Sequence, residues 1–329
     1  MRFTSITFRN FRILQSCKLE LSQQASNFSF ITGGSGKGKT TILEGIGWCL
    51  FERSTNGSEL APSSLLNFDA FHEAQHGDEI FVEVEIETID QSGVENRILR
   101  TETFKKHHGE PMPIGSLLQM HSRRHAGLTW VEVEDPEFWI QSHFPIWQAP
   151  LCLVNSDFAG SLKPDLVRTV TELLAEMGLS ESESLEARAR IATGLMADFS
   201  SITGKGDLIR LHMNEEIDVE LFGASQHQRP YGFLAATDRV SLDLAMSIAI
   251  LREARSEVPL LLDGIFDRFD EQTIRRGLNF LHSVSEGEGG FPPRQVLVFS
   301  SPHLVNRLGG APHEKAPVSI FTLEGVQNF

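Results

Sequence analysis

The sequence predicts an α/β fold in which a mixed sheet is combined with an antiparallel β layer and a short helical insertion. Three observations carry this prediction. Short apolar and β-branched runs fill the first 30 residues and recur between residues 80 and 133. A glycine-rich loop at 33–41 separates a strand pattern from a helix pattern. Strand and helix patterns then alternate between residues 258 and 300, as they do in a parallel α/β layer.

The N-terminal elements follow the order strand, loop, helix. The runs "RFTSITFRNF", "CKLEL" and "NFSFIT" are typical of strands because they are short, β-branched or aromatic, and separated by polar turns. After the glycine loop, Ile42, Ile46 and Leu50 recur at helical spacing until the turn-forming sequence "STNGS". We therefore expect the glycine loop to connect a strand to the start of a helix.

The next stretch has the period of two that a half-exposed strand requires. The apolar positions alternate with Phe81 and three glutamates, and "NRILRTETF" and "LTWVEVE" indicate further strands of the same antiparallel layer. The apolar positions are Ile80, Val82, Val84 and Ile86.

The second half of the chain changes to helical periodicity. We expect one helix over 162–177, a second that carries Leu185 to Phe199, and a third from about Asp238 to Arg255. Two strand-like pieces, "DLIRLHM" and "IDVELFG", lie before the third helix. The chain continues with the strand "VPLLLDG", the helix "EQTIRRGLNFLHSV", the strand "QVLVFSS" and a closing "VSIFTLEG".

The bulk composition is that of a globular protein with an acidic surface. The chain has 329 residues, 40% hydrophobic content and a net charge of -15. It has no apolar run of about 18 residues that could cross a bilayer, and we expect no membrane association and a cytoplasmic location. Because phosphate binding depends mainly on Lys and Arg, the charge argues against a surface that coats nucleic acid indiscriminately.

Two local basic clusters are the candidates for DNA contact, and both lie in a stretch that we expect to be turn-rich. The alternative is that they are solvated loop charges. The clusters are Lys105, Lys106, His107 and His108, and His121, Arg123, Arg124 and His125.

The cysteines give no sign of a disulfide framework or a zinc site. Cys17, Cys49 and Cys152 are odd in number, widely separated and free of CxxC spacing. We expect three reduced, buried thiols.

The glycine loop matches the pattern G-x4-G-K-[ST], which cradles phosphates. Its backbone N–H groups and the following helix N-terminus can face the β-phosphate, Lys39 can reach the β and γ oxygens, and the Thr40 hydroxyl can bind Mg²⁺. We therefore expect ATP and Mg²⁺ as cofactors. The predicted nucleotide-binding residues are Gly33, Gly34, Ser35, Gly36, Lys37, Gly38, Lys39, Thr40 and Thr41.

A nucleotide site of this kind needs a second carboxylate at the end of a neighbouring parallel strand. The run "PLLLD" supplies Asp263 after three leucines, and this order of buried strand and acid is the expected one. Thr40 and Asp263 are thus the predicted metal ligands.

Segments at both ends of the chain resemble the SMC, RecF and DNA-break-repair branch of the ABC-type ATPases, which includes the DndD-like proteins. The resemblance covers roughly residues 1–70 and 230–305 and rests on the glycine loop and four further segments. These are "FTSITFRNFRIL", "LLNFDA", "PLLLDGIFDRFDEQTIRRGLNFL" and "RQVLVFSS".

The resemblance implies an ABC-type P-loop ATPase head formed from two lobes. The N-terminal lobe would span 1–160 and the C-terminal lobe 206–329, with a short helical insertion at 161–205 in place of a long coiled coil. It also implies catalytic roles for four residues. These are Lys39, the Walker B acid Asp263, the D-loop residue Asp270 and the switch histidine His303.

The signature segment departs from the family pattern. Family members carry L-S-x-G-x-[RK] before a helix, in a segment that contacts the γ-phosphate held by another subunit. By the resemblance, Ala235 stands at the serine position and lacks its hydroxyl, and Thr237 adds a β-carbon at the glycine position. The segment consists of Leu234, Ala235, Ala236, Thr237, Asp238 and Arg239.

Two further positions bear on hydrolysis. Gly264 stands where most family members have a glutamate that polarises the attacking water, so Asp267, Asp270, a partner's residue or water alone must serve. A glutamate at 264 is then expected to raise the rate. By order along the chain, the glutamine loop of the family would correspond to Asn155, Ser156 and Asp157. The alternative is that these residues form an ordinary turn at the end of a strand.

The function expected from these features is an ATP-binding, slowly hydrolysing clamp or switch in DNA repair or antiviral defence. It would form a dimer with itself or with a related ATPase subunit, and it would act with a DNA-processing partner. The alternative is a non-catalytic nucleotide sensor that scaffolds an effector such as a nuclease. A transporter subunit and a small kinase fit the sequence less well.

Overall fold

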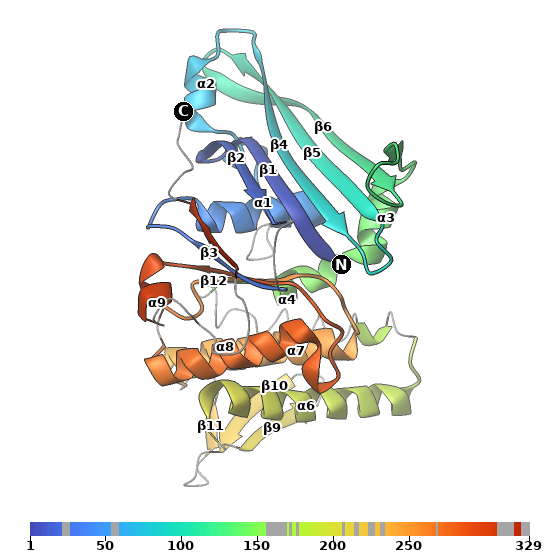
Figure 1. The fold of residues 1–329 in the computed structure, drawn as a ribbon, viewed down its shortest axis with the longest axis vertical. Coiled ribbons are helices and arrows are strands. Elements are labelled where there is room, and N and C mark those ends of the chain that lie inside the picture. The colour runs from blue at the N-terminus through green and yellow to red at the C-terminus, as the bar shows by residue number, and fades with distance from the viewer. Residues whose placement is uncertain are drawn as a thin grey trace.

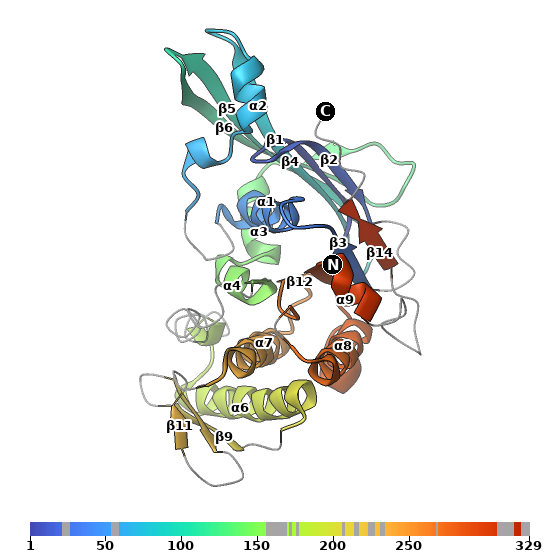
Figure 2. The same cartoon turned by 90° about the vertical axis from the view of Figure 1, so that its left-hand side faces the viewer.

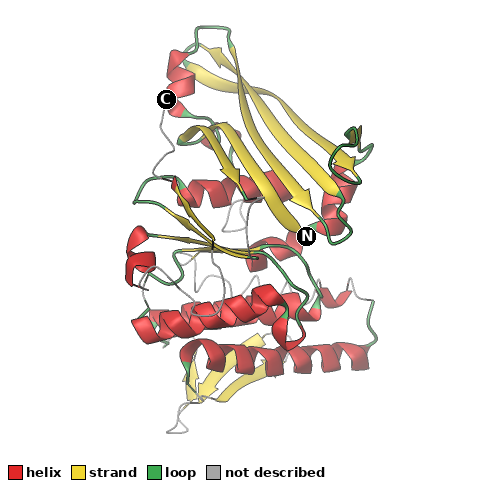
Figure 3. Ribbon diagram, in the orientation of Figure 1, coloured by secondary structure: helices red, strands yellow, loops and turns green. Residues whose placement is uncertain are grey.

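The computed structural model describes residues 1–21, 27–53, 59–155, 170, 173–175, 178–205, 208–213, 217–222, 228–230, 234–267, 269–307 and 319–323. Its elements lie in stacked layers (Figure 1), and Figure 3 shows how strands and helices alternate between these layers. An antiparallel sheet lies at one end, followed by a helix, a parallel sheet and a set of helices. The predicted α/β class with an antiparallel layer is confirmed.

The antiparallel sheet has the strand order β2-β1-β4-β5-β6-β7. As predicted, Ile80, Val82, Val84 and Ile86 are buried on one face of β4, while the intervening side chains are partly or fully exposed. The strands are β1 (Arg2–Phe11), β2 (Leu14–Glu20), β4 (Glu79–Ile89), β5 (Glu95–His107), β6 (Glu110–Arg123) and β7 (Val131–Glu132).

The stretch that we expected to be turn-rich is instead a long hairpin of β5 and β6. The first basic cluster lies at its tip, and the second lies at the far end of β6. The sequence does not predict β6, because Pro111, Pro113 and Gly115 weaken its strand pattern. The structure tolerates them because β6 is an edge strand over this part, since β7 pairs only with His121 and Ser122.

Strands from both ends of the chain form the parallel sheet, in the order β14-β3-β13-β12-β8. Its pairing aligns the carboxyl ends of the strands: Asp263 is in register with both Asn155 and Phe299, and Ser300 with Thr32. The strands are β3 (Phe28–Thr32), β8 (Leu153–Asn155), β12 (Leu260–Asp263), β13 (Val296–Ser300) and β14 (Ser319–Thr322).

Helix α1 (Lys39–Phe51) lies between the two sheets. It contacts β1, β4 and β5 on one side and β12 and β13 on the other. For this reason most of its side chains are buried around the whole circumference. The glycine loop at its N-terminus is therefore held by both sheets. The shorter α-helices between α1 and β8 in the chain are α2 (Phe68–Glu73), α3 (Pro136–His143) and α4 (Ala149–Cys152).

The other face of the parallel sheet is covered by α7 and α8, and α6 packs along α7 (Figure 2). The predicted pieces "DLIRLHM" and "IDVELFG" form two strands of a small three-stranded sheet beyond α6. The helix expected over 162–177 falls largely outside the described residues. The elements are α6 (Glu181–Thr203), β9 (Leu208–Met213), β10 (Ile217–Phe222), β11 (Gln228–Pro230), α7 (Ala236–Glu253), α8 (Glu271–Glu286) and α9 (Pro302–Arg307).

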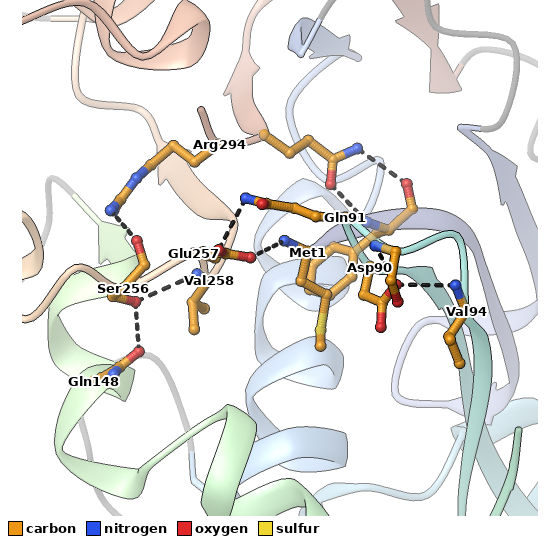
Figure 4. A network of polar contacts seen from close by, with 12 residues as sticks. Met1, Asp90, Gln91, Val94, Gln148, Ser256, Glu257, Val258 and Arg294 are labelled. Atoms are coloured by element: carbon orange, nitrogen blue, oxygen red, sulfur yellow. Dashed lines mark hydrogen bonds and ion pairs between the residues drawn. The ribbon is translucent and has the colours of Figure 1, made fainter. Parts of the chain in front are cut away.

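A polar network joins the two halves of the chain at the amino ends of β12 and β13 (Figure 4). The Gln295 side chain accepts a hydrogen bond from the Phe3 N–H (2.8 Å) and donates one to the Phe3 carbonyl (3.0 Å). Glu257 accepts from the Gln91 amide at 2.8 Å. Burial lowers the pKa of the Arg294 guanidinium to about 10. The opposite, carboxyl-terminal edge of the sheet is where the predicted site residues gather.

Within the described part of the chain, no helix combines the length and apolarity needed to cross a bilayer.

Candidate functional site

The glycine loop turns the chain from β3 into α1 through two left-handed glycines. Gly36 has φ 74° and Gly38 has φ 90°. Gly38 is the N-cap of α1 and provides no side-chain cap, so the first N–H groups of the helix are available to a ligand. A β-carbon on Gly38 would lie 2.8 Å from Leu14 Cδ2, and this approach explains why the position needs glycine.

Lys39 folds back over its own loop. Its ammonium donates to the carbonyl oxygens of Gly33 (2.7 Å) and Gly34 (3.0 Å). These are neutral acceptors, so an anionic ligand would offer the ammonium a stronger partner than the loop does.

Thr40 and Asp263 are separated by 223 positions in the sequence and meet at the edge of the sheet. The Thr40 hydroxyl donates to Asp263 Oδ2 at 2.6 Å, and the Asn155 amide donates to the same oxygen at 3.3 Å. Asp263 and Asn155 are buried, whereas Thr40 is exposed. The hydroxyl of the loop and the acid of β12 are thus within direct contact.

A cavity of about 350 Å³ opens above these residues. It is polar on the side of the loop and the strand ends, which places a helix N-terminus, an ammonium and two carboxylates around one space. Its lining consists of Ile13, Ser35, Gly36, Gly38, Lys39, Thr40, Thr41, Asn155, Asp263, Gly264 and Asp267.

These residues fit a magnesium nucleotide. Mg²⁺ prefers hard oxygen ligands, and the Thr40 hydroxyl and the Asp263 carboxylate are such donors within 2.6 Å of each other. A β-carbon built on Gly36 meets no atom within 4 Å, so the loop leaves open space on the cavity side. Thr40 and Asp263 would hold the ion, and the loop N–H groups and Lys39 would hold phosphates.

Several predicted site residues do not line this cavity in the described structure. Asp270 is the N-cap of α8, where its carboxylate accepts from the Thr273 N–H at 2.8 Å. His303 is exposed in the first turn of α9, directly after β13. Gly33, Gly34 and Lys37 belong to the loop but not to the lining of the cavity, and the carbonyls of Gly33 and Gly34 accept from Lys39.

The signature segment also lies apart from the cavity, at the start of α7. Ala235 is its N-cap and is exposed, and the hydroxyl of Ser241 donates to the Thr237 carbonyl at 2.9 Å. Asp238 forms an ion pair with Lys205. Of the segment only Ala235 is exposed, Leu234 is buried and the other four residues are half-buried, and the contact with another subunit remains a prediction.

Asn155 is the site residue with the weakest signal in the sequence. It ends β8 beside β12 and contacts the predicted metal ligand, whereas Ser156 and Asp157 lie outside the described residues. A polar residue directly after a buried strand was the available signal, and only the strand order places it next to Asp263.

The turn after β12 is set by Gly264. Its φ is 64°, a left-handed value that favours glycine, and its N–H donates to the Phe299 carbonyl at 3.1 Å. A glutamate at this position would therefore be strained. The expectation that Gly264→Glu raises the rate loses its support.

Two of the basic candidates for DNA contact have structural partners instead. Lys106 donates to the carbonyls of Phe71 (2.8 Å) and Ala74 (2.7 Å) at the end of α2. Arg123 binds Glu95 at 2.6 Å and lies over the Trp130 ring. At the hairpin tip, the rings of His107 and His108 cluster with that of His76 at centroid distances of 4.1 to 5.7 Å.

The three cysteines are free and buried, as expected. Burial raises the pKa of Cys17 to about 11 and those of Cys49 and Cys152 to about 12. None of them is therefore a reactive thiolate near neutral pH.

Comparison with known proteins agrees with this geometry. The family model for an AAA domain matches residues 5–124. The fold is similar to an SMC head crystallised with the C-terminal winged-helix domain of ScpA, with TM-score 0.63, 13% identity, and 91% of this chain and 90% of that chain covered. Among curated proteins, none matches this chain in sequence.

Two further SMC heads give comparable matches. The head from Pyrococcus furiosus, bound to the C-terminal domain of ScpA, has TM-score 0.56 and 15% identity and covers 93% of this chain and 91% of its own. The head from Thermotoga maritima has TM-score 0.50 and 13% identity, and the match covers 93% of this chain and 92% of that chain. At these identities the similarity establishes the fold.

Proposed function

Because this chain has the SMC-like, ABC-type P-loop fold of an ATP-binding ATPase domain, we propose that it is a slowly hydrolysing, ATP-dependent switch that acts with a partner protein. The observation that carries the proposal is the contact of Thr40 with Asp263 beneath an uncapped helix N-terminus. A glycine loop that served only as a turn would not need a buried acid and an amide at its side.

The residues of the chain would divide the work of binding. The first N–H groups of α1 and the Lys39 ammonium would hold the phosphates, with Lys39 exchanging its two carbonyl partners for phosphate oxygens. Thr40 and Asp263 would hold Mg²⁺, and Asn155 would keep the Asp263 carboxylate in place. Bound Mg²⁺ would neutralise charge on the phosphate oxygens.

Hydrolysis is proposed to be slow because the position after Asp263 is a glycine. Without a carboxylate at this position the water must be activated by another group, and loss of a well-positioned general base typically lowers a rate by about 10² to 10⁴. ATP binding would therefore act mainly as a conformational signal, and hydrolysis would reset it.

The signature segment does not belong to the described lining of the nucleotide cavity, and this supports an assembly in which a second subunit completes the site. Ala235 and Thr237 weaken a self-complementary contact, so a related ATPase subunit is favoured over a homodimer. Two of the three solved SMC heads named above are bound to parts of ScpA, which supports a partner protein of some kind for this chain. We infer a role in DNA repair or antiviral defence, with DNA contact through the two local basic clusters.

The alternative is a non-catalytic nucleotide sensor that scaffolds an effector such as a nuclease. Gly264 and the altered signature favour it, whereas the intact set of Lys39, Thr40 and Asp263 favours retained hydrolysis. Steady-state turnover with and without DNA separates the two.

The binding site is tested by calorimetric titration of Mg²⁺-ATP into the parent, Lys39→Ala and Lys37→Ala. Lys37 is the matched control because it is an exposed lysine of the same loop outside the cavity lining. We expect Lys39→Ala to weaken binding on the order of 100-fold and Lys37→Ala to leave it nearly unchanged. Equal affinities in all three proteins would refute the site.

The assembly is tested by sedimentation with ADP and with a non-hydrolysable ATP analogue at several protein concentrations. The analogue should favour a two-headed particle, or a heteromer when a copurifying partner is present. Identical monomeric behaviour under all conditions would refute a switch that works by the closure of two heads on ATP.

A further inference from the structure

The turn that follows β12 brings a second carboxylate to the nucleotide cavity. After the left-handed Gly264, the Asp267 N–H donates to the Gly264 carbonyl at 3.1 Å and closes a tight turn. The Asp267 side chain is exposed and lines the cavity together with Lys39, Thr40 and Asp263. A glycine at 264 is therefore the means by which the chain reverses and places Asp267 at the cavity.

The sequence offered Asp270 as an equal alternative, and the structure separates the two. The Asp270 carboxylate accepts hydrogen bonds from the Thr273 N–H (2.8 Å) and hydroxyl (3.2 Å). The backbone bond from Thr273 is the main cause that lowers its pKa. Asp270 thus serves as the cap of α8 and is absent from the described lining of the cavity.

We propose that Asp267 is the catalytic carboxylate that activates the attacking water in this chain. This assignment rests on the proposed function, namely ATP hydrolysis in the same cavity. It differs from the pattern of relatives with a glutamate directly after the Walker B acid, because here the carboxylate comes from the far side of a turn.

The step is a direct displacement by water. The water oxygen forms a bond to the γ-phosphorus while the bond from that phosphorus to the β–γ bridging oxygen breaks, and its electron pair stays on ADP. The water gives one proton to the Asp267 carboxylate, which later returns it to the released phosphate or to solvent. No co-reactant is needed.

The first experiment compares single-turnover hydrolysis of ATP by the parent, Asp267→Asn, Asp267→Glu and Glu271→Gln. Glu271→Gln is the matched control, because Glu271 is an exposed carboxylate in the first turn of α8 and does not belong to the lining of the cavity. We expect Asp267→Asn to slow hydrolysis at least about tenfold, a small factor because hydrolysis by the parent is already slow. Asp267→Glu should retain part of the rate, and Glu271→Gln should match the parent.

A second readout does not depend on turnover. A carboxylate beside the γ-phosphate repels it, so Asp267→Asn should tighten a non-hydrolysable ATP analogue relative to ADP on the order of fivefold. Glu271→Gln should leave this ratio unchanged. Calorimetric titrations of both nucleotides measure it.

The outcomes separate this inference from the proposed function. If all variants bind ATP but Asp267→Asn keeps the parental rate and affinity ratio, the assignment of Asp267 is wrong and the ATP switch stands. If the parent binds ATP but forms no product in a single turnover, the assignment is also overturned, and the sensor alternative is favoured. Failure of the parent to bind ATP overturns both.

Discussion

The hydrogen bond from Thr40 to Asp263 offers a test of the site that needs no ligand. Thr40→Val removes the hydroxyl with little change in volume and leaves the Asp263 carboxylate without its closest donor. Hydrogen bonds to charged groups contribute about 1.5 to 3 kcal/mol. Because Thr40 is exposed and water can replace its hydroxyl, we expect the low end, a loss of about 1.5 kcal/mol in the free energy of unfolding.

The assay is urea unfolding of the nucleotide-free parent, Thr40→Val, Asp263→Asn and the double variant. If the two groups interact as the geometry indicates, the double-mutant cycle should give a coupling of about 1 kcal/mol or more. Thr40→Ser is the matched control, because it keeps the hydroxyl and should stay within about 0.5 kcal/mol of the parent.

The same variants connect stability to binding. A ligand at 100 times its Kd stabilises the folded state by about 2.7 kcal/mol. Mg²⁺-ATP should give the parent and Thr40→Ser this gain, and it should stabilise Thr40→Val much less at the same concentration. Strict additivity in the nucleotide-free cycle would refute the reasoning, since it would mean that the glycine loop does not contact β12.

Three further predictions concern a buried ion pair between α6 and α7 and two glycines of the nucleotide site. Asp198 is buried and accepts two hydrogen bonds from Arg252, at 2.7 and 2.9 Å. Burial raises the pKa of the Asp198 carboxyl to about 6 in the folded protein. The contribution of this group to the free energy of unfolding is therefore present below its unfolded pKa and is lost as the pH rises through 6. Asp198→Asn should therefore flatten the decline of the unfolding free energy between pH 4 and 7. Asp198→Ala should lower the unfolding free energy by about 3 kcal/mol at pH 7, because it leaves Arg252 without this partner. Urea titrations across this pH range measure both effects, and an unchanged slope in Asp198→Asn would contradict the raised pKa. Gly38→Ala should weaken ATP binding roughly 5- to 30-fold in calorimetry with an unchanged circular dichroism spectrum, because alanine is strained at φ 90° and its methyl meets Leu14. Gly264→Glu should lower the unfolding free energy by about 1 kcal/mol and give no gain in turnover, and a faster variant would show that the turn adapts.

The local features of the fold follow from the sequence. The strand, glycine loop and helix around Lys39 depend on neighbouring residues, and so does the alternation of Ile80 to Ile86. Asp263 could be predicted because an acid after an apolar strand is itself a local pattern. The free state of the three cysteines likewise follows from their number and spacing.

Edge position and side-chain partners could not be predicted, because they depend on contacts between distant segments. Pro111 and Pro113 argue against a strand until β6 is known to be an edge. Lys106 looks like a free cation until the end of α2 is known to meet the hairpin.

The sequence by itself determined that a phosphate-binding loop, a buried strand with a terminal acid and an antiparallel layer exist, because each is a pattern over fewer than about 15 residues. Only the tertiary structure decided what stands beside the loop. The order of the parallel strands brings Asn155 to Asp263, and the left-handed turn at Gly264 sends Asp267 into the cavity while Asp270 caps a helix. The physical reason is that strand order is fixed by packing between segments more than 100 positions apart, and that the turn at Gly264 is held against Phe299 of another strand, which no local pattern encodes.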